Sequence, residues 1–502
     1  MTGQLQQPQK KDDTFTTKTN SFLDWLVSNN VQISPKISIH DYRSTNQGRG
    51  IIATADIEAN EQLFVLPRSV LINVVNNSLI EKYPAIQDNL KSMDQWLALI
   101  IILSYESKFG TKWKHYFSVI PDEFNQLSFW KNDELRDLEP SCILERIGKE
   151  NNLNMYNQVI KIIDDLKIVE LQGQLSVEEY NRIATTIMSY SFDVEVPKPK
   201  KETNGGTKEN GEHNDDEEHD DEEHDDDEEL EEDEEEEEDE YYKSMVPLAD
   251  TLNADTHLNN AVLMYSETDL IMTSIKRIPQ GEQVYNIYSE HPNSELLRRY
   301  GYVEPQGSKY EFGEIPISII KSYFVTKYGI TKETLNRILD LVNHEFKLEN
   351  EHDEELLLDS YDAFNSGDVI IELVFLIQIL TVILTIDPES NSEAIHRIFS
   401  KVYQLIEAKK VTKQFVENYQ EILAIRLGQY PEIAKTDYEE FSDNNLSRKQ
   451  MAEIVLKSEY KSLKNCFEIK DYKVIDDEKL IKNIIKKRAA EDDGKTTKKS
   501  KK

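Results

Sequence analysis

Three segments of the chain have residue types that could hold a polar cofactor and orient a reacting group. Glycine allows backbone amides to approach a ligand closely, while asparagine and tyrosine offer hydrogen-bonding groups. A β-turn would explain a glycine pair taken alone, so only the three segments together indicate a cofactor site. They are Gly48-Arg49-Gly50, then Asp250-Thr251-Leu252-Asn253-Ala254-Asp255, then Gly281-Glu282-Gln283-Val284-Tyr285-Asn286-Ile287-Tyr288 with its continuation to Arg299-Tyr300-Gly301-Tyr302.

Motifs of several common enzyme classes are missing. The sequence has no Gly-x-Ser-x-Gly, no complete Walker loop of the form Gly-x-x-x-x-Gly-Lys-Ser/Thr and no His-Glu-x-x-His, which disfavours the hydrolases that use them. The glycine pair precedes a strand-like run, Ile51 to Thr54. A dinucleotide-binding fold needs the order strand, glycine-rich turn, helix. The segment is therefore not of the Rossmann type.

The acidic charge of the chain is concentrated in one segment. The formal net charge is -37, and the stretch from Glu212 to Glu240 contributes 24 carboxylates, so the remainder is near -13. A chain of this charge repels phosphate backbones; we expect a basic protein partner and no direct nucleic-acid binding. His213, His219 and His224 lie in the acidic stretch; we attribute them to composition and predict no metal site.

The cysteines and the apolar runs of the sequence bear on the cellular compartment and on a possible membrane span. Cys142 and Cys466 lie too far apart in sequence for a disulfide framework or a four-thiolate zinc site, which suits a reducing compartment. The N-terminus lacks the apolar core of a secretory signal. The run from Val369 to Ile386 is long and apolar but carries Glu372 and Gln378, so we expect a buried core helix and no membrane span.

Hydrophobic periodicity predicts an α+β region followed by an all-α region. We expect residues 1–19 to be disordered, a helix near Phe22 to Leu26, short strands within 31–76, and a helical block at about 84–192. A disordered acidic loop follows at about 197–240. Later ranges are predicted strands at 261–265, 270–274 and 283–287, and predicted helices at 332–344, 368–386, 392–407, 413–427 and 447–464.

The order of the three segments resembles the SET-domain protein-lysine methyltransferases: a Gly-x-Gly strand, an Asp-x-x-Asn segment, then Gly-Glu-x-x-x-Asn-x-Tyr ending in Arg-Tyr-Gly-aromatic. The helical insert and helical C-terminal half resemble the Rubisco large-subunit methyltransferase class of that family. Within that class the resemblance is to the fungal ribosomal lysine methyltransferase 4 group, through 188–192 and 252–255. It implies a SET domain at 20–303, a substrate-binding domain at 304–485 and a basic tail at 486–502.

The resemblance also implies site residues and a cofactor, S-adenosylmethionine. Tyr288 would be the catalytic phenol that orients the amine, and Tyr300 part of the wall between cofactor and lysine channel. The lysine would lose its proton on entering an apolar channel, with no strong general base. Residues implied at the cofactor, besides Tyr300, are Gly48, Arg49, Gly50, Tyr190, Asn253 and Ala254, which replaces the usual histidine.

Trp130 and Ser191 would face the substrate peptide by the same resemblance. For Trp130, pairing with Phe129 in a core is an equally good interpretation of the sequence.

The implied activity is transfer of one methyl group to a lysine of a large-subunit (60S) ribosomal protein. A histone or other nuclear protein is an alternative substrate, and an acidic, non-catalytic chaperone for basic proteins is an alternative function. Two basic clusters, Lys486-Lys487-Arg488 and Lys498 to Lys502, suit a bipartite nuclear-import signal, or are a solvated tail. We expect a monomer in the nucleus, and also in the cytoplasm.

Overall fold

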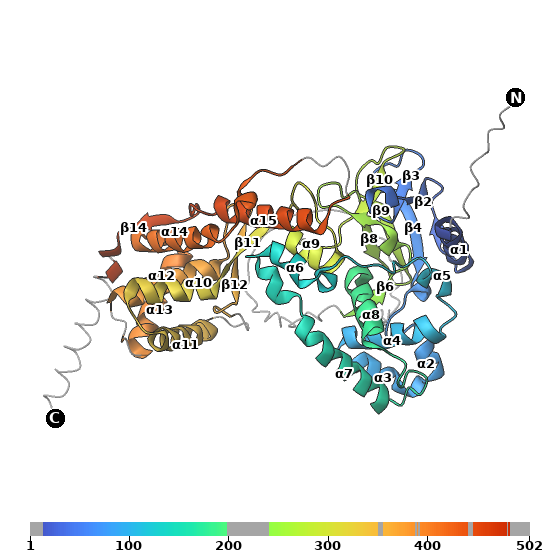
Figure 1. Cartoon of the computed structure of the whole chain (residues 1–502), viewed down its shortest axis with the longest axis horizontal. Coiled ribbons are helices and arrows are strands. Elements are labelled where there is room, and N and C mark those ends of the chain that lie inside the picture. Colours follow the sequence, from blue (N-terminus) through green and yellow to red (C-terminus); the bar gives the residue numbers. More distant parts are fainter. Residues whose placement is uncertain are drawn as a thin grey trace, which may run out of the picture.

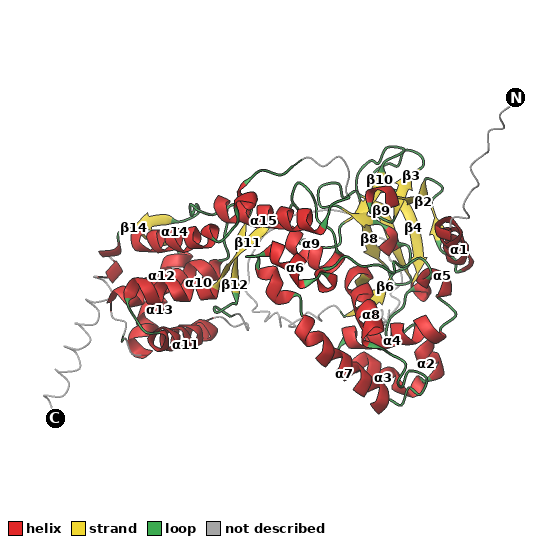
Figure 2. Cartoon of the chain, in the orientation of Figure 1, coloured by secondary structure: helices red, strands yellow, loops and turns green. Residues whose placement is uncertain are grey.

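The computed structural model describes residues 14–197, 240–349, 355–386, 389, 392–439, 445–478 and 480–481. These residues form an elongated molecule, with a mixed half built from the N-terminal part of the chain and a helical half built from the C-terminal part (Figure 1). The strands gather mainly in the mixed half (Figure 2). The predicted acidic loop, apart from its end residues, and the predicted basic tail lie outside the described residues.

Two four-stranded sheets form the centre of the mixed half. Their strand orders are β1-β4-β9-β8 and β2-β3-β10-β7. Each sheet combines strands from before and after the acidic loop, as the sequence predicts, and buried residues such as Ile51, Leu66, Met272 and Val284 share one apolar core. The strands are β1 (Gln32–Ile33), β2 (Ile37–Asp41), β3 (Arg49–Ala53), β4 (Gln62–Pro67), β7 (Asn253–Ala254), β8 (Ala261–Tyr265), β9 (Asp269–Ser274) and β10 (Gln283–Asn286).

The helical insert covers one end of the sheets (Figure 2). Its longest apolar helix, α4, is buried from Leu97 to Glu106, as the continuous apolar run predicts. The Asp94 side chain caps α4 by accepting a hydrogen bond from Leu97 N at 3.0 Å, which satisfies an otherwise unpaired amide. The helices are α2 (Ser78–Lys82), α3 (Gln87–Ser92), α4 (Gln95–Phe109), α5 (Lys114–Phe117), α6 (Asn132–Leu135), α7 (Lys149–Asp165) and α8 (Val177–Tyr190).

Helix α8 ends earlier than the sequence periodicity predicts. It begins with a capping box between Ser176 and Glu179 and stops at Tyr190 instead of continuing to residue 192. The chain then pairs as strand β5 (Ser191–Glu195) with β6 (Tyr241–Met245), across the acidic loop. Backbone pairing with a distant segment thus ends the helix, and the local sequence does not predict this end.

Helix α1 (Thr14–Ser28) begins within the stretch predicted to be disordered. Arg49 of β3 explains the extra turns: its guanidinium stacks 4.0 Å from the Phe15 ring centroid and donates to Thr19 Oγ1 at 2.9 Å. This polar segment is ordered because a residue thirty positions away holds it. The prediction of disorder is therefore wrong for residues 14–19, and residues 1–13 lie outside the described residues.

The C-terminal half is mainly helical but contains two small sheets that the prediction of an all-α region missed. Strands β11 and β12 form an antiparallel pair, and β13 and β14 a parallel one. Partners so far apart in sequence leave no local periodicity. The elements are β11 (Phe312–Pro316), α10 (Ile317–Tyr328), α11 (Lys332–Glu349), β12 (Ser360–Phe364), α12 (Ile371–Ile386), α13 (Ser392–Glu407), β13 (Lys410–Thr412), α14 (Lys413–Gly428), α15 (Arg448–Asn465) and β14 (Lys473–Ile475).

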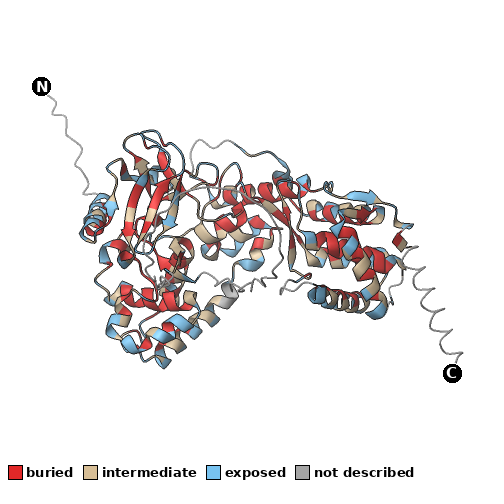
Figure 3. Cartoon of the chain, turned by 180° about the vertical axis from the view of Figure 1, so that it is seen from behind, coloured by how far each residue is buried: buried red, intermediate tan, exposed pale blue. Residues whose placement is uncertain are grey.

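The apolar run at 369–386 forms α12, which is buried from Leu373 to Leu384. Figure 3 shows buried residues along this part of the helical half and through the sheets of the mixed half. Among the helices that the structure describes, none is both long and apolar enough to cross a membrane.

Helix α15 joins the two halves. It packs against α9 (Asn293–Tyr300) of the mixed half and against β11 and β12 of the helical half. Trp130, Leu297 and Val455 lie in one apolar core at this junction. The position of α9 therefore depends on contacts made by the C-terminal half.

A buried set of charges reinforces the junction. Arg426 is 2% exposed and donates to the carbonyl oxygens of Glu314 at 2.7 Å and Pro140 at 3.0 Å. The Glu314 carboxylate in turn accepts two hydrogen bonds of 2.7 Å from Arg146, and Arg146 lies 3.2 Å from the carboxylate of Glu295 in α9. Charge-assisted contacts thus run from α14 through β11 to α9.

Replacing Arg426 by alanine should destabilise the protein by about 3–5 kcal/mol, because it removes one partner from a buried polar network. Chemical denaturation followed by circular dichroism measures the change. The control is Arg277→Ala, which removes an exposed ion pair with Asp56 and should cost about 1 kcal/mol or less. Equal losses in the two variants would contradict the importance of the buried network.

Candidate active site

Strand β10 brings the three segments singled out in the sequence into one site. Its residues Gln283 and Val284 pair antiparallel with β3, directly beyond the Gly48–Gly50 segment. On its other edge, Tyr285 and Asn286 pair in parallel with Asn253 and Ala254 of β7. The chain then leaves β10 towards Tyr288, so the predicted cofactor residues and the predicted catalytic residue lie around one strand.

The backbone of Gly50 packs directly against polar side chains of β7 and β10. Asn253 Nδ2 donates to Gln283 Oε1 at 2.7 Å, and Gln283 Nε2 donates to the Tyr285 hydroxyl at 2.7 Å. A Cβ atom on residue 50 would collide with Gln283 Oε1 and lie 2.6 Å from Asn253 Nδ2. Only glycine leaves room for this polar cluster. Gly48 has φ +67, a left-handed conformation that glycine adopts readily.

Three tyrosines form the other wall of the site. The ring centroid of Tyr288 is 4.8 Å from that of Tyr300 and 6.2 Å from that of Tyr302. The Tyr288 hydroxyl donates to the carbonyl oxygen of Leu252 at 2.8 Å. Burial raises the pKa of Tyr288 well above its ordinary value, so the group is a neutral phenol at physiological pH. Tyr302, the last aromatic of the third segment, was not among the predicted site residues.

The half-buried carboxyl of Asp250, which contacts a buried tyrosine, is a second feature that was not among the predicted site residues. Tyr116 of α5 donates its hydroxyl to Asp250 Oδ2 at 2.5 Å, and burial raises the pKa of Asp250 to about 7. Burial, with the nearby charge of Asp250, also raises the pKa of Tyr190 at the end of α8. Asp250 was visible as the first residue of the Asp-x-x-Asn segment, but Tyr116 carries no signal in the sequence.

Two predicted site residues have other contacts in this structure. The side chain of Arg49 points to α1, where its guanidinium contacts Phe15 and Thr19 and also donates to Val119 O at 3.0 Å. Trp130 is 2% exposed in the core at the junction of the two halves. The predicted pairing with Phe129 does not form, because Phe129 is 39% exposed and stacks on Phe124 at 5.6 Å. A contact of Trp130 with the substrate peptide stays a prediction.

The other predicted substrate residue, Ser191, lies next to Tyr190 at the start of β5 and pairs with Met245. It is half-buried. Its place beside Tyr190 is compatible with a peptide contact, which stays a prediction.

A pocket of about 520 Å³ lies beside the end of β7. Its lining residues come from two segments of the mixed half, and the first of these segments directly follows Asn253 and Ala254 in the sequence. They are Asp255, His257, Leu258, Glu304, Pro305, Gln306 and Gly307. The Glu304 carboxylate accepts from Thr256 N at 2.7 Å, and burial raises its pKa.

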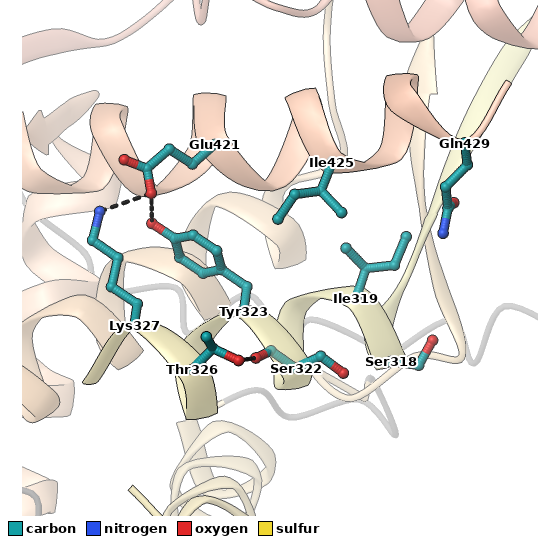
Figure 4. Close-up of a pocket in the computed structure, with 9 residues that line it drawn as sticks. All are labelled: Ser318, Ile319, Ser322, Tyr323, Thr326, Lys327, Glu421, Ile425 and Gln429. Atoms are coloured by element: carbon teal, nitrogen blue, oxygen red, sulfur yellow. Dashed lines mark hydrogen bonds and ion pairs between the residues drawn. The ribbon is translucent and has the colours of Figure 1, made fainter. Parts of the chain in front are cut away.

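A larger pocket, of about 680 Å³, lies between α10 and α14 in the helical half (Figure 4). There the Tyr323 hydroxyl and the Lys327 ammonium both contact the Glu421 carboxylate, each at 2.8 Å. Ile319 and Ile425 line its other end. No residue of the three segments singled out in the sequence lines this pocket. Within the described residues, no group of three or more His, Cys, Asp or Glu side chains is placed to hold a metal ion.

Comparison with known proteins gives the family. No family model matches the sequence. Ribosomal lysine N-methyltransferase 4 of Saccharomyces cerevisiae is 37% identical over 504 residues, which cover 96% of this chain and 98% of that protein. N-lysine methyltransferase SETD6 of Bos taurus is 27% identical over 57% of both chains.

The fold agrees with these relatives. A solved SET domain of LSMT bound to methyllysine and AdoHcy superposes with a TM-score of 0.58 at 15% identity, and covers 94% of this chain and 92% of its own. Rubisco LSMT bound to sinefungin and monomethyllysine superposes with a TM-score of 0.56 at 18% identity. The SET fold predicted from the sequence is confirmed. The identity of 37% over nearly the full length of both chains shows that this chain belongs to the ribosomal lysine N-methyltransferase 4 family of SET-domain protein-lysine N-methyltransferases.

Proposed function

We propose that this enzyme transfers one methyl group from S-adenosylmethionine to a lysine of a large-subunit ribosomal protein. The observation that carries the proposal is the arrangement around β10, which places Gly50, Asn253 and the Tyr288 phenol in one site. The name of the Saccharomyces cerevisiae relative supports the ribosomal substrate. The titles of the LSMT structures, with AdoHcy, AdoMet and methyllysine, support the cofactor and the reaction.

The residues around β10 fit this cofactor. Among the described residues, none donates a hydrogen bond to Asn253 Oδ1, so this oxygen can accept one from the ammonium group of the amino-acid part. Gly50 removes the side chain that would close the space beside Asn253, and Ala254 presents backbone groups at the end of β7. S-adenosylmethionine supplies a methyl group on a sulfonium, an electrophile that an unprotonated amine can attack.

The tyrosines position the amine and exclude water. Because the Tyr288 hydroxyl proton is donated to Leu252 O, the phenol oxygen keeps lone pairs that can accept a hydrogen bond from the lysine amine. The rings of Tyr300 and Tyr302 pack against Tyr288, and aromatic faces stabilise a nearby cation. A reaction between a fixed amine and a fixed methyl group gains most from such alignment.

The charge of the chain supports a basic protein substrate. Ribosomal proteins contact RNA phosphates and are correspondingly basic, and a net charge of -37 raises the rate of encounter with such partners. The C-terminal half provides the docking surface, and its groove between α10 and α14 is a concave part of that surface (Figure 4). We propose that the enzyme acts as a monomer.

We also propose that the enzyme enters the nucleus through the two basic clusters at 486–488 and 498–502. A fluorescent fusion should accumulate in the nucleus, and neutralising both clusters with glutamine should leave it in the cytoplasm. The same distribution for both proteins would exclude these clusters as an import signal.

Tyr288→Phe should lower methyl transfer by about 100-fold, because the variant keeps the ring and loses the hydroxyl that orients the amine. The assay follows radiolabel from S-adenosylmethionine into proteins of isolated large ribosomal subunits, with core histones tested in parallel. The control is Tyr156→Phe, which removes a similar hydrogen bond, to Leu175 O at 2.9 Å, outside the site. Label in a histone would move the substrate, and equal label in both variants would exclude Tyr288 as the catalytic residue.

Gly50→Ala should weaken binding of S-adenosylmethionine by about tenfold or more, because the added methyl group would displace the Asn253 and Gln283 side chains from their present positions. Isothermal titration calorimetry measures the affinity. Gly428→Ala in α14, where an added Cβ meets no atom within 4 Å, is the matched control and should bind as the unmodified enzyme does. Unchanged affinity in Gly50→Ala would place the cofactor elsewhere.

A further inference from the structure

Asn125 holds the backbone directly after Tyr300. Its Nδ2 atom donates to the carbonyl oxygen of Gly301 at 3.0 Å. Gly301 caps the C-terminus of α9 with φ +78°, and a Cβ atom on this residue would lie 3.1 Å from Asn125 C and from Gln126 N. The left-handed conformation and the close approach both favour glycine here. The backbone of Asn125 and Gln126 therefore packs directly against the end of α9.

Gln126 holds the backbone directly before Tyr300, through one serine. Its Nε2 atom donates to Ser189 Oγ at 2.7 Å, and this hydroxyl donates in turn to the carbonyl oxygen of Arg299 at 2.7 Å. Gln126 and Ser189 are 3% and 8% exposed, and hydrogen bonds are stronger in such a low-dielectric region than in water. Asn125 and Gln126, called the clamp below, thus fix the two carbonyl groups that flank Tyr300.

Arg448 of α15 holds the clamp from the C-terminal half. Its Nε atom donates to Asn125 Oδ1 at 3.0 Å, and its guanidinium forms an ion pair of 2.7 Å with Glu134. The same guanidinium lies 5.5 Å from the ring centroid of Trp130, whose Nε1 atom donates to Asn125 O at 2.8 Å. The Asn125 amide therefore has a defined orientation, because its oxygen faces Arg448 and its nitrogen faces Gly301.

We propose that Asn125 is a positioning residue, which fixes Tyr300 against Tyr288, and that Arg448 in turn fixes Asn125. The inference rests on the proposed function, in which Tyr300 forms part of the wall between cofactor and lysine channel. The ring centroids of Tyr300 and Tyr288 are 4.8 Å apart, so a displacement of the Tyr300 backbone moves the wall directly beside the catalytic phenol. Methyl transfer depends on alignment, so even a small displacement there lowers the rate. The rate therefore depends on a contact between the two halves of the molecule.

Asn125→Asp tests the proposal because it separates the two contacts of the side chain. The variant keeps an acceptor for Arg448 and replaces the donor to Gly301 O by a second oxygen, which repels this carbonyl. With large-subunit proteins as acceptor, kcat should fall by about tenfold. The Kd of S-adenosylmethionine should stay within about threefold, because the residues around β10 are unchanged. A merely structural Asn125 would lower only the folded fraction, and an unchanged kcat per cofactor-binding site, counted by calorimetry, overturns the proposal.

Asn465→Asp is the matched control. Asn465 lies at the opposite end of α15 from Arg448, and its Nδ2 atom donates to Asn365 O at 2.9 Å, so the variant makes the same chemical change outside the site. Its kcat should stay within about twofold of that of the unmodified enzyme. A loss equal to that of Asn125→Asp would show that the added charge lowers the rate whatever its position, and it would overturn the proposal.

A double-mutant cycle tests whether Asn125 acts through Tyr300. Tyr300→Ala removes the ring that the clamp positions, so the addition of Asn125→Asp should change kcat by less than about threefold. Two independent effects would instead multiply, and a loss equal to the product of the two single losses overturns the proposal. Ser189→Ala removes the hydrogen bond to Arg299 O. It enters the same cycle in place of Asn125→Asp if that variant folds poorly, with the same expected result.

A label on Tyr300 gives a readout that needs no activity. Fluorotyrosine incorporated at this residue should give a fluorine resonance that moves or broadens in Asn125→Asp and in Arg448→Met, and that is unchanged in Asn465→Asp. An unchanged resonance in the first two variants overturns the proposal, whatever their rates. If the unmodified enzyme labels no large-subunit protein, the proposed function fails. If it does so, and the resonance and kcat of Asn125→Asp are those of the unmodified enzyme, only the present inference fails.

Discussion

The site depends on backbone pairing at both edges of β10. A strand offers hydrogen-bonding groups on two sides, and here β3 occupies one side and β7 the other. The register pairs Gln283 with Ile52 of β3 and Tyr285 with Asn253 of β7, so the Gln283 and Asn253 side chains meet beside Gly50. A shift of one residue would turn these two side chains to the opposite face. Pairing of three short strands therefore sets the positions of groups that lie more than 200 residues apart in sequence.

Desolvation is the second condition of the site. The tyrosines and Asp250 lie in a low-dielectric region, which disfavours charged forms and shifts pKa values away from those in water. Tyr288 remains a neutral hydrogen-bonding group, and desolvation raises the pKa of Asp250 to about 7. The same effect would lower the pKa of a lysine that enters the site.

The C-terminal half contributes more than a surface. Helix α15 packs against α9, and the Arg146 guanidinium links Glu295 of α9 with Glu314 of β11. Helix α9 ends at Tyr300, in the wall of the site. The two halves therefore share a junction of packed helices and ion pairs next to the site, and the proposed docking of substrate on the C-terminal half would take place beside this junction.

The sequence determined the features that local pattern encodes. The apolar runs predicted α4 and α12, the strand-like segments predicted β8 to β10, and the resemblance carried by the order of the three segments predicted the SET fold. Only the tertiary structure decided features that depend on distant neighbours. Trp130 is buried in a core to which α15 contributes, and Phe15 and Thr19 of α1 are held by Arg49. Asp250 meets Tyr116 across 134 positions of sequence. Burial and long-range contact arise from packing, which no local periodicity records.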